Sequence, residues 1–246
     1  MYIFVHMGTE SNMLVIDAGN TSVKVAQFKG DNLVSVTPYA LEEMKVKFGN
    51  DTKTTTVISS VLSAEKTAQI VELFENSTLI TSSTSLPLNL EYTTKNTLGI
   101  DRICNAVFAA TASTSDHAVV IDIGTCVKFD LIHKEKGYLG GSISPGIDLR
   151  YKSLNDYTGN LPLLSDRTSL PLLGTDTNTS IQSGVINGLK GELQEFMSQY
   201  KSEFKDLTFF VTGGDARYFD LDAKNDIFAD RNLTIKGLYE IYKFNA

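Results

Sequence analysis

Hydrophobic positions alternate with polar ones in the first part of the chain, on either side of a glycine-containing turn. Residues 13–30 read MLVID, then a turn at Ala18-Gly19-Asn20, then TSVKVAQFKG. Apolar runs flanking a turn whose residues tolerate positive φ predict a β-hairpin. The periodicity that follows, with Ser63 as a helix cap, predicts further elements. These are a strand at 33–37, a helix at 40–48, a strand at 54–62, a helix at 63–74 and a strand at 78–80.

The same pattern returns later in the chain. Residues 118–132 read AVVIDIGTCVKFDLI, again strand, turn and strand, and a third strand is expected at 137–143. A duplicated unit predicts two related α/β domains that face each other across a cleft. We expect an N-terminal extension at 1–12, one domain at 13–113 and a second at 114–246.

Helical periodicity marks two other stretches. Residues 99–113 are small and apolar on nearly every side, which predicts a buried helix. A long helix is expected where Ile181, Val185, Leu189 and Leu193 recur at every fourth position. Residues 208–216, TFFVTGGDA, predict a buried strand that ends in a Gly-Gly turn.

Composition excludes several functions. The 246 residues are 42% hydrophobic and include 22 basic and 29 acidic side chains, a net charge of −7. This charge predicts no general affinity for nucleic acid or an anionic membrane. Two cysteines and three scattered histidines make a disulfide framework or a histidine-rich metal centre improbable. No apolar run approaches the roughly 20 residues that cross a bilayer, so we expect a cytoplasmic protein.

The first turn has the features of a phosphate-binding loop. Glycine lets the backbone approach a phosphate, and the amides of Asn20 and Thr21 are candidate donors. Asp17 is placed to hold magnesium, through water, and Lys24 to reach a phosphate. An ordinary Asp-Gly or Asn-Gly hairpin turn explains this stretch equally well on its own. The second copy, Asp-Ile-Gly-Thr at 122–125, favours phosphate binding.

The buried helix begins with Gly99-Ile100-Asp101-Arg102, an acid next to a guanidinium. One interpretation makes Asp101 a general base toward a hydroxyl, with Arg102 binding an anionic group. The other makes Asp101 a helix cap and Arg102 its salt-bridging neighbour. Two glycine-rich segments, 140–147 and 212–215, are read equally well as ligand contacts or as plain connections.

Together these segments resemble type III pantothenate kinases of the actin-like ATPase and sugar kinase superfamily. The matching motifs follow in order from Met13: DAGNTSVK at 17–24, Tyr92, GIDR at 99–102, DIGT at 122–125, GGSISPGI at 140–147, GTDT ending at Thr177 and TGGDA at 212–216. The resemblance implies two actin-like (ribonuclease H-like) α/β domains facing across an ATP-binding cleft.

The resemblance also implies an activity and a set of site residues. ATP would phosphorylate pantothenate to 4'-phosphopantothenate, the first step of coenzyme A biosynthesis, in a homodimer with Mg²⁺ present. Asp101 would accept the proton, and Asp122 would bind a potassium or ammonium ion. The implied ATP-binding residues are Asp17, Ala18, Gly19, Asn20, Thr21, Ser22, Val23, Lys24 and Thr125. The implied pantothenate-binding residues are Tyr92, Gly99, Ile100, Asp101, Arg102 and Thr177.

Two departures and two rival functions accompany this resemblance. Lys95 stands where the family often has proline, and Lys128 puts a cation where a small hydroxyl side chain is usual.

One rival function is that of a catalytically silent accessory factor, which the presence of Asp17 and Asp101 disfavours. The other is a different kinase of the superfamily, such as a sugar kinase, for which the chain is short. Gly184 and Gly188 on the long helix predict close packing, either with a second copy or within the chain.

Overall fold

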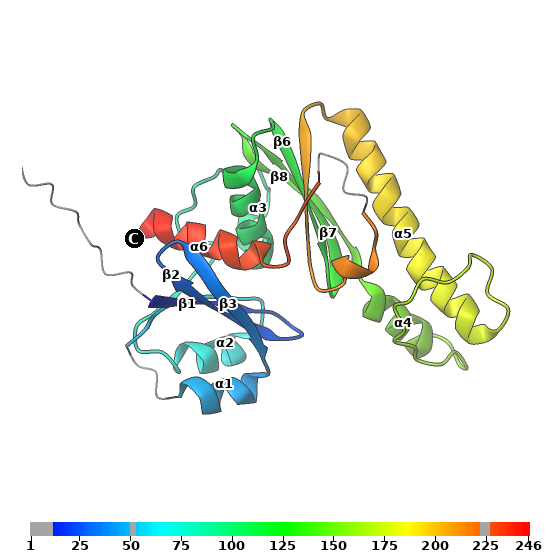
Figure 1. Cartoon of the computed structure of the whole chain (residues 1–246), viewed down its shortest axis with the longest axis horizontal. Coiled ribbons are helices and arrows are strands. Elements are labelled where there is room, and N and C mark those ends of the chain that lie inside the picture. The colour runs from blue at the N-terminus through cyan, green and yellow to red at the C-terminus, as the bar shows by residue number, and fades with distance from the viewer. Residues whose placement is uncertain (1–11, 50–52, 222–226) are drawn as a thin grey trace, which may run out of the picture. The chain divides into compact units, whose positions relative to one another are not determined.

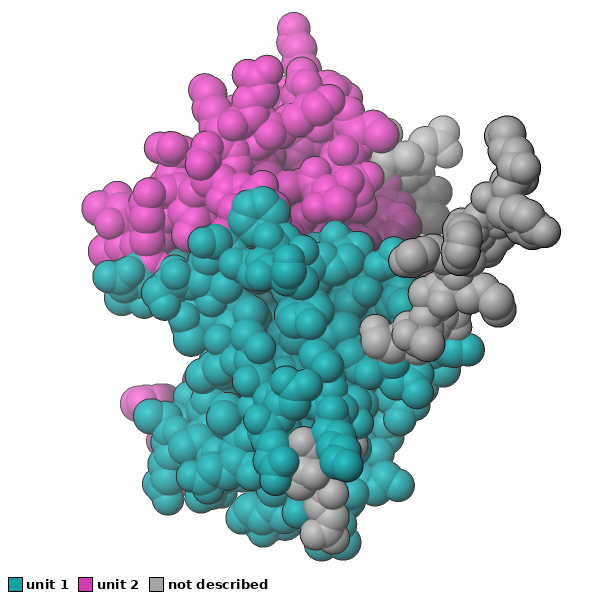
Figure 2. Space-filling model, turned by 90° about the vertical axis from the view of Figure 1, so that its left-hand side faces the viewer, with its two compact units in different colours: residues 1–85, 96–104, 234–246 teal, residues 86–95, 105–233 magenta. Residues whose placement is uncertain are grey.

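The computed structural model describes residues 12–49, 53–221 and 227–246. These form two compact units, one made of 1–85, 96–104 and 234–246 and the other of 86–95 and 105–233 (Figure 2). Most of the expected extension, 1–11, lies outside the described residues, and Asn12 already begins the first strand. The expected domain boundary at residue 113 stays a prediction.

Unit 1 is built on a five-stranded sheet in the order β3-β2-β1-β4-β5. The hairpin is confirmed: β1 runs antiparallel to β2, and β4 joins the other side of β1 in parallel. The strands are β1 Asn12–Ala18, β2 Val23–Lys29, β3 Asn32–Tyr39, β4 Thr55–Ser60 and β5 Ser77–Leu79. The helices of this part of the chain are α1 Leu41–Phe48, α2 Ala64–Val71 and the 3₁₀ turn Lys95–Thr97.

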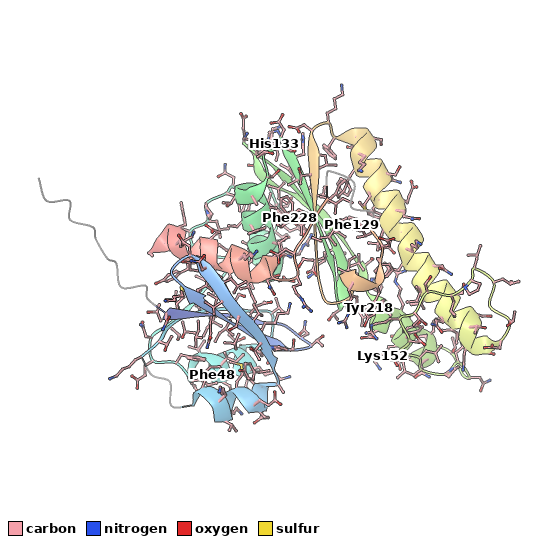
Figure 3. All side chains as sticks on the ribbon, in the orientation of Figure 1. Phe48, Phe129, His133, Lys152, Tyr218 and Phe228 are labelled. Carbon is pink, nitrogen blue, oxygen red and sulfur yellow. The ribbon has the colours of Figure 1, made fainter. Side chains whose placement is uncertain are left out.

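The core of unit 1 follows from the alternation in these strands. Leu14 and Ile16 of β1 pack with Met44 and Phe48 of α1, all of them buried. The ring of Phe48, labelled in Figure 3, meets Tyr39 edge-on at 5.5 Å between centroids. Ser63 accepts a hydrogen bond from the backbone N–H of Lys66, which confirms the predicted cap of α2.

Unit 2 repeats this arrangement strand for strand (Figure 1). Its sheet order, read from the other edge as β8-β7-β6-β9-β10, is that of unit 1 with each strand replaced by the one five places later. The predicted duplication therefore covers the whole sheet. The strands are β6 His117–Ile123, β7 Cys126–His133, β8 Gly137–Pro145, β9 Leu207–Thr212 and β10 Ile227–Ala229. The helices are α4 Ile147–Asp156, α5 Thr177–Glu203 and the 3₁₀ turn Ala216–Tyr218.

The long helix α5 supplies much of the core of unit 2. The residues predicted at four-residue spacing, Ile181, Val185, Leu189 and Leu193, are all buried there. Phe129 of β7, labelled in Figure 3, stacks on Phe196 at 4.8 Å. The periodicity of α5 thus reports the face that it turns to the sheet.

Two further helices complete the chain. The predicted buried helix is α3, Ile100–Ala112, whose first five residues group with unit 1 and whose remainder groups with unit 2. No element is predicted from the sequence for α6, Leu233–Asn245, yet residues 234–246 belong to unit 1. A Cβ at Gly237 would lie 1.8 Å from the carbonyl oxygen of Cys104, so α6 crosses α3 in close contact.

Aromatic and polar contacts fix α6 on the sheet of unit 1. The ring of Tyr239 stacks on Phe28 at 4.2 Å, and its hydroxyl lies 2.9 Å from both Gly30 O and Asp31 Oδ1. Within the described part of the chain, no helix has the length and apolar character needed to span a membrane.

Candidate functional site

The first predicted phosphate turn follows β1. The N–H of Gly19 donates to the carbonyl of Ser22 at 3.1 Å, which closes the turn and leaves Asn20 and Thr21 exposed. The side chains of Ala18 and Val23 point into the core, at 0% and 2% exposure. These two residues therefore anchor the turn, and only their backbone groups are available to a ligand.

The second turn, between β6 and β7, is built in a similar way. The N–H of Gly124 donates to the carbonyl of Cys126 at 3.1 Å, and the side chain of Thr125 is exposed. The N–H of Gly146 donates to Thr125 O at 3.0 Å, and a Cβ on Gly146 would lie 2.0 Å from Gly124 O. The end of the 140–147 segment thus passes against this turn, at a distance that a side chain would prevent.

A third glycine-rich segment meets the same turn. Gly213 has a φ of +100°, and its Cβ would lie 2.2 Å from the carbonyl oxygen of Ile123. The N–H of Asp215 donates to that same oxygen at 2.9 Å. Asp215 also precedes the 3₁₀ turn at 216–218, which agrees with the interpretation of the 212–215 segment as a helix start, and its contact with a nucleotide base stays a prediction.

Each hairpin places a lysine opposite its aspartate. Asp17 pairs in register with Lys24, and both residues are half-buried. Asp122 pairs with Lys128, and here Nζ lies 2.7 Å from Oδ2. An ammonium group already holds the carboxylate oxygen that was expected to bind a potassium or ammonium ion. The residues present at Asp122 therefore do not fit a free monovalent cation.

Two predicted site carboxylates lie near Cys104 in unit 1: Asp101 in the first turn of α3 and Asp17 in β1. Burial raises the pKa of the Cys104 thiol well above its usual value, and the negative charges of Asp17 and Asp101 raise it further. Both carboxylates therefore lie close enough to act on the same buried sulfur. A raised pKa favours the neutral thiol at Cys104 over the thiolate.

The glycine before α3 shapes the position of Asp101. A Cβ on Gly99 would lie 2.5 Å from Oδ1 of Asp101, so the carboxylate folds back over Gly99. Arg102 is 5% exposed, and its backbone N–H donates to Gly99 O at 3.1 Å. α3 begins at Ile100, so Gly99 stands at the cap position and the half-buried Asp101 lies in the first turn. The interpretation of Asp101 as the helix cap is therefore wrong, and its role as a base stays a prediction.

Two predicted substrate residues belong to unit 2. Tyr92 meets Tyr138 edge-on at 5.7 Å, and the hydroxyl of Tyr138 donates to the buried Asp130 at 2.8 Å. Thr177 is the first residue of α5, where Asp176 caps the helix by accepting from the N–H of Thr179 at 2.9 Å. Thr177 is exposed and therefore free of core packing.

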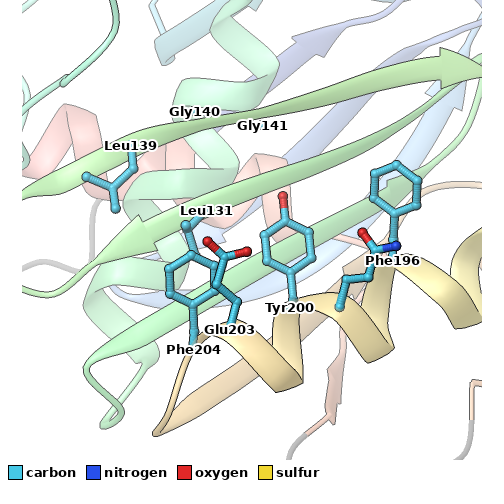
Figure 4. Close-up of a pocket in the computed structure, with 9 residues that line it drawn as sticks. Leu131, Leu139, Gly140, Gly141, Phe196, Tyr200, Glu203 and Phe204 are labelled. Carbon is cyan, nitrogen blue, oxygen red and sulfur yellow. The ribbon is translucent and has the colours of Figure 1, made fainter.

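Thr177 lines a pocket of about 770 Å³ between α4 and α5. Arg150, which the sequence analysis did not single out, lines the same pocket and forms an ion pair with Glu192. Ser144 of the 140–147 segment donates to Glu192 as well. A second pocket, of about 380 Å³, lies between Gly140 and Gly141 of β8 and the aromatic end of α5, and none of the residues expected to bind ATP or pantothenate lines it (Figure 4).

The carboxylates suit magnesium held together with a substrate. The described residues contain no group of three or more His, Cys, Asp or Glu side chains able to hold a metal ion by themselves. Magnesium is usually bound by one or two carboxylates, water and substrate phosphates, so a single half-buried acid such as Asp17 fits it.

Comparison with known proteins finds the same family across the chain. Residues 13–199 match the family model described as type III pantothenate kinase. A type III pantothenate kinase of Christiangramia forsetii is 37% identical over 238 residues, which cover 94% of this chain and 98% of that protein. A type III pantothenate kinase of Phocaeicola vulgatus is 35% identical over 237 residues, covering 94% and 98%.

Solved structures share the fold. A conserved putative Baf family transcriptional activator from Campylobacter jejuni aligns with a TM-score of 0.64 at 21% identity, over 95% of this chain and 98% of that chain. MreB5 of Spiroplasma citri, bound to ADP, aligns with a TM-score of 0.53 at 10% identity, over 97% and 98%. At these identities the likeness concerns the fold, and it agrees with two actin-like domains.

Proposed function

This chain belongs to the type III pantothenate kinase family, and we propose which of its residues carry the reaction of an ATP-dependent pantothenate kinase in coenzyme A biosynthesis. The observation that supports the proposal best is that the charges of Asp17 and Asp101 both raise the pKa of the buried Cys104 thiol, in the part of α3 that belongs to unit 1. A candidate metal-binding acid and a candidate base therefore share one part of unit 1.

Asp101 accepts the proton of the pantothenate hydroxyl as the phosphoryl group is transferred. Because the phosphoryl-transfer transition state is loose, the main tasks of the protein are positioning and charge neutralisation. Arg102, buried beside the base, binds the carboxylate of pantothenate, and a guanidinium suits a planar anion. Gly99, Ile100, Tyr92 and Thr177 complete the proposed substrate site.

The turn at 17–24 and Thr125 of the second turn bind ATP. The exposed Asn20 and Thr21 and the half-buried Ser22 and Lys24 contact its phosphates. Asp17 holds Mg²⁺ through water, and the bound ion offsets the charge of the phosphates.

ADP release by the purified protein tests this function. With ATP and Mg²⁺ present, adding pantothenate should start ADP release, and adding common sugars should not. A rate with sugars that matches the rate with pantothenate would contradict the proposal and favour a sugar kinase. Pantothenate binding without any ADP release would favour a silent accessory factor.

Gly99→Ala should lower kcat and leave the fold intact. The new Cβ would lie 2.5 Å from Oδ1 of Asp101, so the carboxylate must move, and a displacement of about 1 Å at a reacting group costs up to about 10²-fold in rate. Because the obstacle is the end of a flexible side chain, the melting temperature should change little. Gly191→Ala is the control, since its Cβ would meet no atom within 4 Å. An unchanged kcat in Gly99→Ala would contradict the placement of Asp101.

We also propose that the protein is a homodimer that uses the surface around the start of α5. Leu172 and Leu173 before this helix are 85% and 80% exposed, far more than large apolar side chains usually are. Apart from the backbone of its own helix, a Cβ at Gly184 or Gly188 would meet no atom of the described residues within 4 Å, so no contact among them requires a glycine there. A second copy packed here would lie next to Thr177.

Light scattering behind a sizing column tests the dimer. At sub-micromolar protein the mass should be that of two chains, because obligate interfaces bury roughly 2,000 Å² or more. Leu172→Glu with Leu173→Glu should give the mass of one chain. Val46→Glu changes an apolar residue of similar exposure, 89%, on α1 and should leave the dimer intact. A single-chain mass in the unaltered, fully active protein would refute the dimer.

We place the reaction in the cytoplasm. Cys104 and Cys126 are both free thiols, as is usual for proteins of reducing compartments.

A further inference from the structure

The β6–β7 hairpin carries an ion pair where the family resemblance implies a bound monovalent cation. Nζ of Lys128 lies 2.7 Å from Oδ2 of Asp122, and each side chain is only 14% exposed. The two residues stand directly opposite each other in the antiparallel register. The position of the pair is therefore set by the hydrogen-bonded strands, unlike that of two long side chains meeting on an open surface.

The surroundings connect this ion pair with the second phosphate turn. A Cβ at Gly124 would lie 3.8 Å from Oδ1 of Asp122, so one oxygen of the carboxylate lies near the turn and the other holds the ammonium group. On its other side Asp122 has Thr212 of β9 as its parallel neighbour. The positive charge of Lys128 is thus positioned at the base of the turn that presents Thr125.

We propose that the ammonium group of Lys128 takes the place of a dissociable monovalent cation at Asp122, so that this kinase works without added potassium or ammonium. The proposal rests on the pantothenate kinase activity. A lysine ammonium carries one positive charge and three donors, so it neutralises the carboxylate as a bound ion would. A free ion on the same oxygen would have to displace Nζ and remain beside a second positive charge, partly shielded from water.

A tethered cation differs from a dissolved one in being present at every salt concentration. Its effective concentration at Asp122 is set by the strand register and not by the buffer. A fixed positive charge close to the phosphate turn also needs no reorganisation when negative charge shifts during transfer. Lys128 is thereby a positioning residue for the charge around ATP, acting with Asp122.

The first experiment measures the unaltered protein in different salts. ATP is supplied as its Tris salt with magnesium, and potassium, ammonium or tetramethylammonium chloride is added at equal ionic strength. The rate of pantothenate phosphorylation should be the same in all three salts. A rate that depends on potassium or ammonium would overturn the proposal.

The second experiment removes the tethered charge. Lys128→Thr should lower kcat on the order of 10²-fold in tetramethylammonium chloride, and potassium or ammonium should restore most of the loss. Potassium should also raise the melting temperature of Lys128→Thr and not that of the unaltered protein, because only the variant gains a cation site. If Lys128→Thr keeps its rate without potassium and shows no such shift, the proposal fails.

Two further variants separate charge from packing. Lys128→Met keeps the length of the side chain without its charge, so its rate should fall and potassium should not restore it, because the thioether fills the site. Lys45→Thr breaks an exposed ion pair with Glu42 and should behave like the unaltered protein.

If Lys128→Thr does not fold, the salt series on the unaltered protein and the rate of Lys128→Met decide whether Lys128 replaces the cation. If no salt supports phosphorylation by the unaltered protein, the kinase assignment fails, and the melting comparison still tests the ion pair.

Discussion

Asp101→Asn should lower kcat by about 10²–10⁴-fold, the usual cost of removing a general base. The amide keeps the shape of the carboxylate and its place over Gly99, but it cannot accept a proton at neutral pH. ATP binding and the melting temperature should stay close to those of the unaltered protein. The measurement is steady-state ADP release, together with nucleotide binding by calorimetry.

The matched control for this substitution is Asp116→Asn, the same change at an exposed acid just before β6. It should leave kcat unchanged. If Asp101 served only at the start of α3, its replacement would lower the melting temperature slightly and leave kcat as it was. That result would remove Asp101 from the reaction.

Asp17→Asn should raise the magnesium concentration needed for half-maximal rate by about 10–100-fold, the usual effect of losing a group that holds a metal through water. Asp17 is half-buried at the end of β1, next to the turn that is proposed to hold the phosphates. Saturating magnesium should restore part of the rate, because the metal also binds ATP directly. A magnesium titration of the ADP-release rate measures the effect.

Asp31→Asn provides the contrast within the same unit. Asp31 lies in the β2–β3 turn, where the hydrogen bond from Tyr239 and the charge of Lys243 lower its pKa. Its replacement should reduce thermal stability and leave the magnesium titration unchanged. A shift of the titration in Asp31→Asn as large as in Asp17→Asn would show that the effect comes from loosening of unit 1.

The sequence predicted correctly those turns, caps and helix faces that depend on residues close together in the chain. The Gly19 turn, the Ser63 cap and the buried stripe of α5 each depend on residues within a few positions of one another, and each is found where expected. The order of the strands was predicted only as far as each hairpin and the third strand that follows it. β4 joins the side of β1 that faces away from β2, and β9 joins the side of β6 that faces away from β7. Both additions depend on parallel pairing between distant segments, which periodicity does not encode.

The ion pair of Lys128 shows a signal that the sequence analysis left unused. The sequence predicted Lys128 as a departure from the family and Asp122 as the ligand of a potassium or ammonium ion. In a hairpin the residues at equal distance from the turn lie opposite each other, and these two both stand three positions from Thr125. The partner of Asp122 could therefore be read from spacing alone. The exposure of Leu172 and the contact of Arg150 with Glu192 have no such local signature, since they depend on where α4 and α5 pack.

The place of α6 in unit 1 sets an order of assembly during synthesis. The hydroxyl of Tyr239 meets the carbonyl of Gly30 across 209 positions of sequence, and residues 234–246 leave the ribosome after all of 105–233. When all strands of both sheets have been translated, unit 1 still lacks α6, and Phe28 lacks its stacking partner. Unit 1 can therefore complete its packing only after the whole of unit 2 has been synthesised, although N-terminal domains generally fold first.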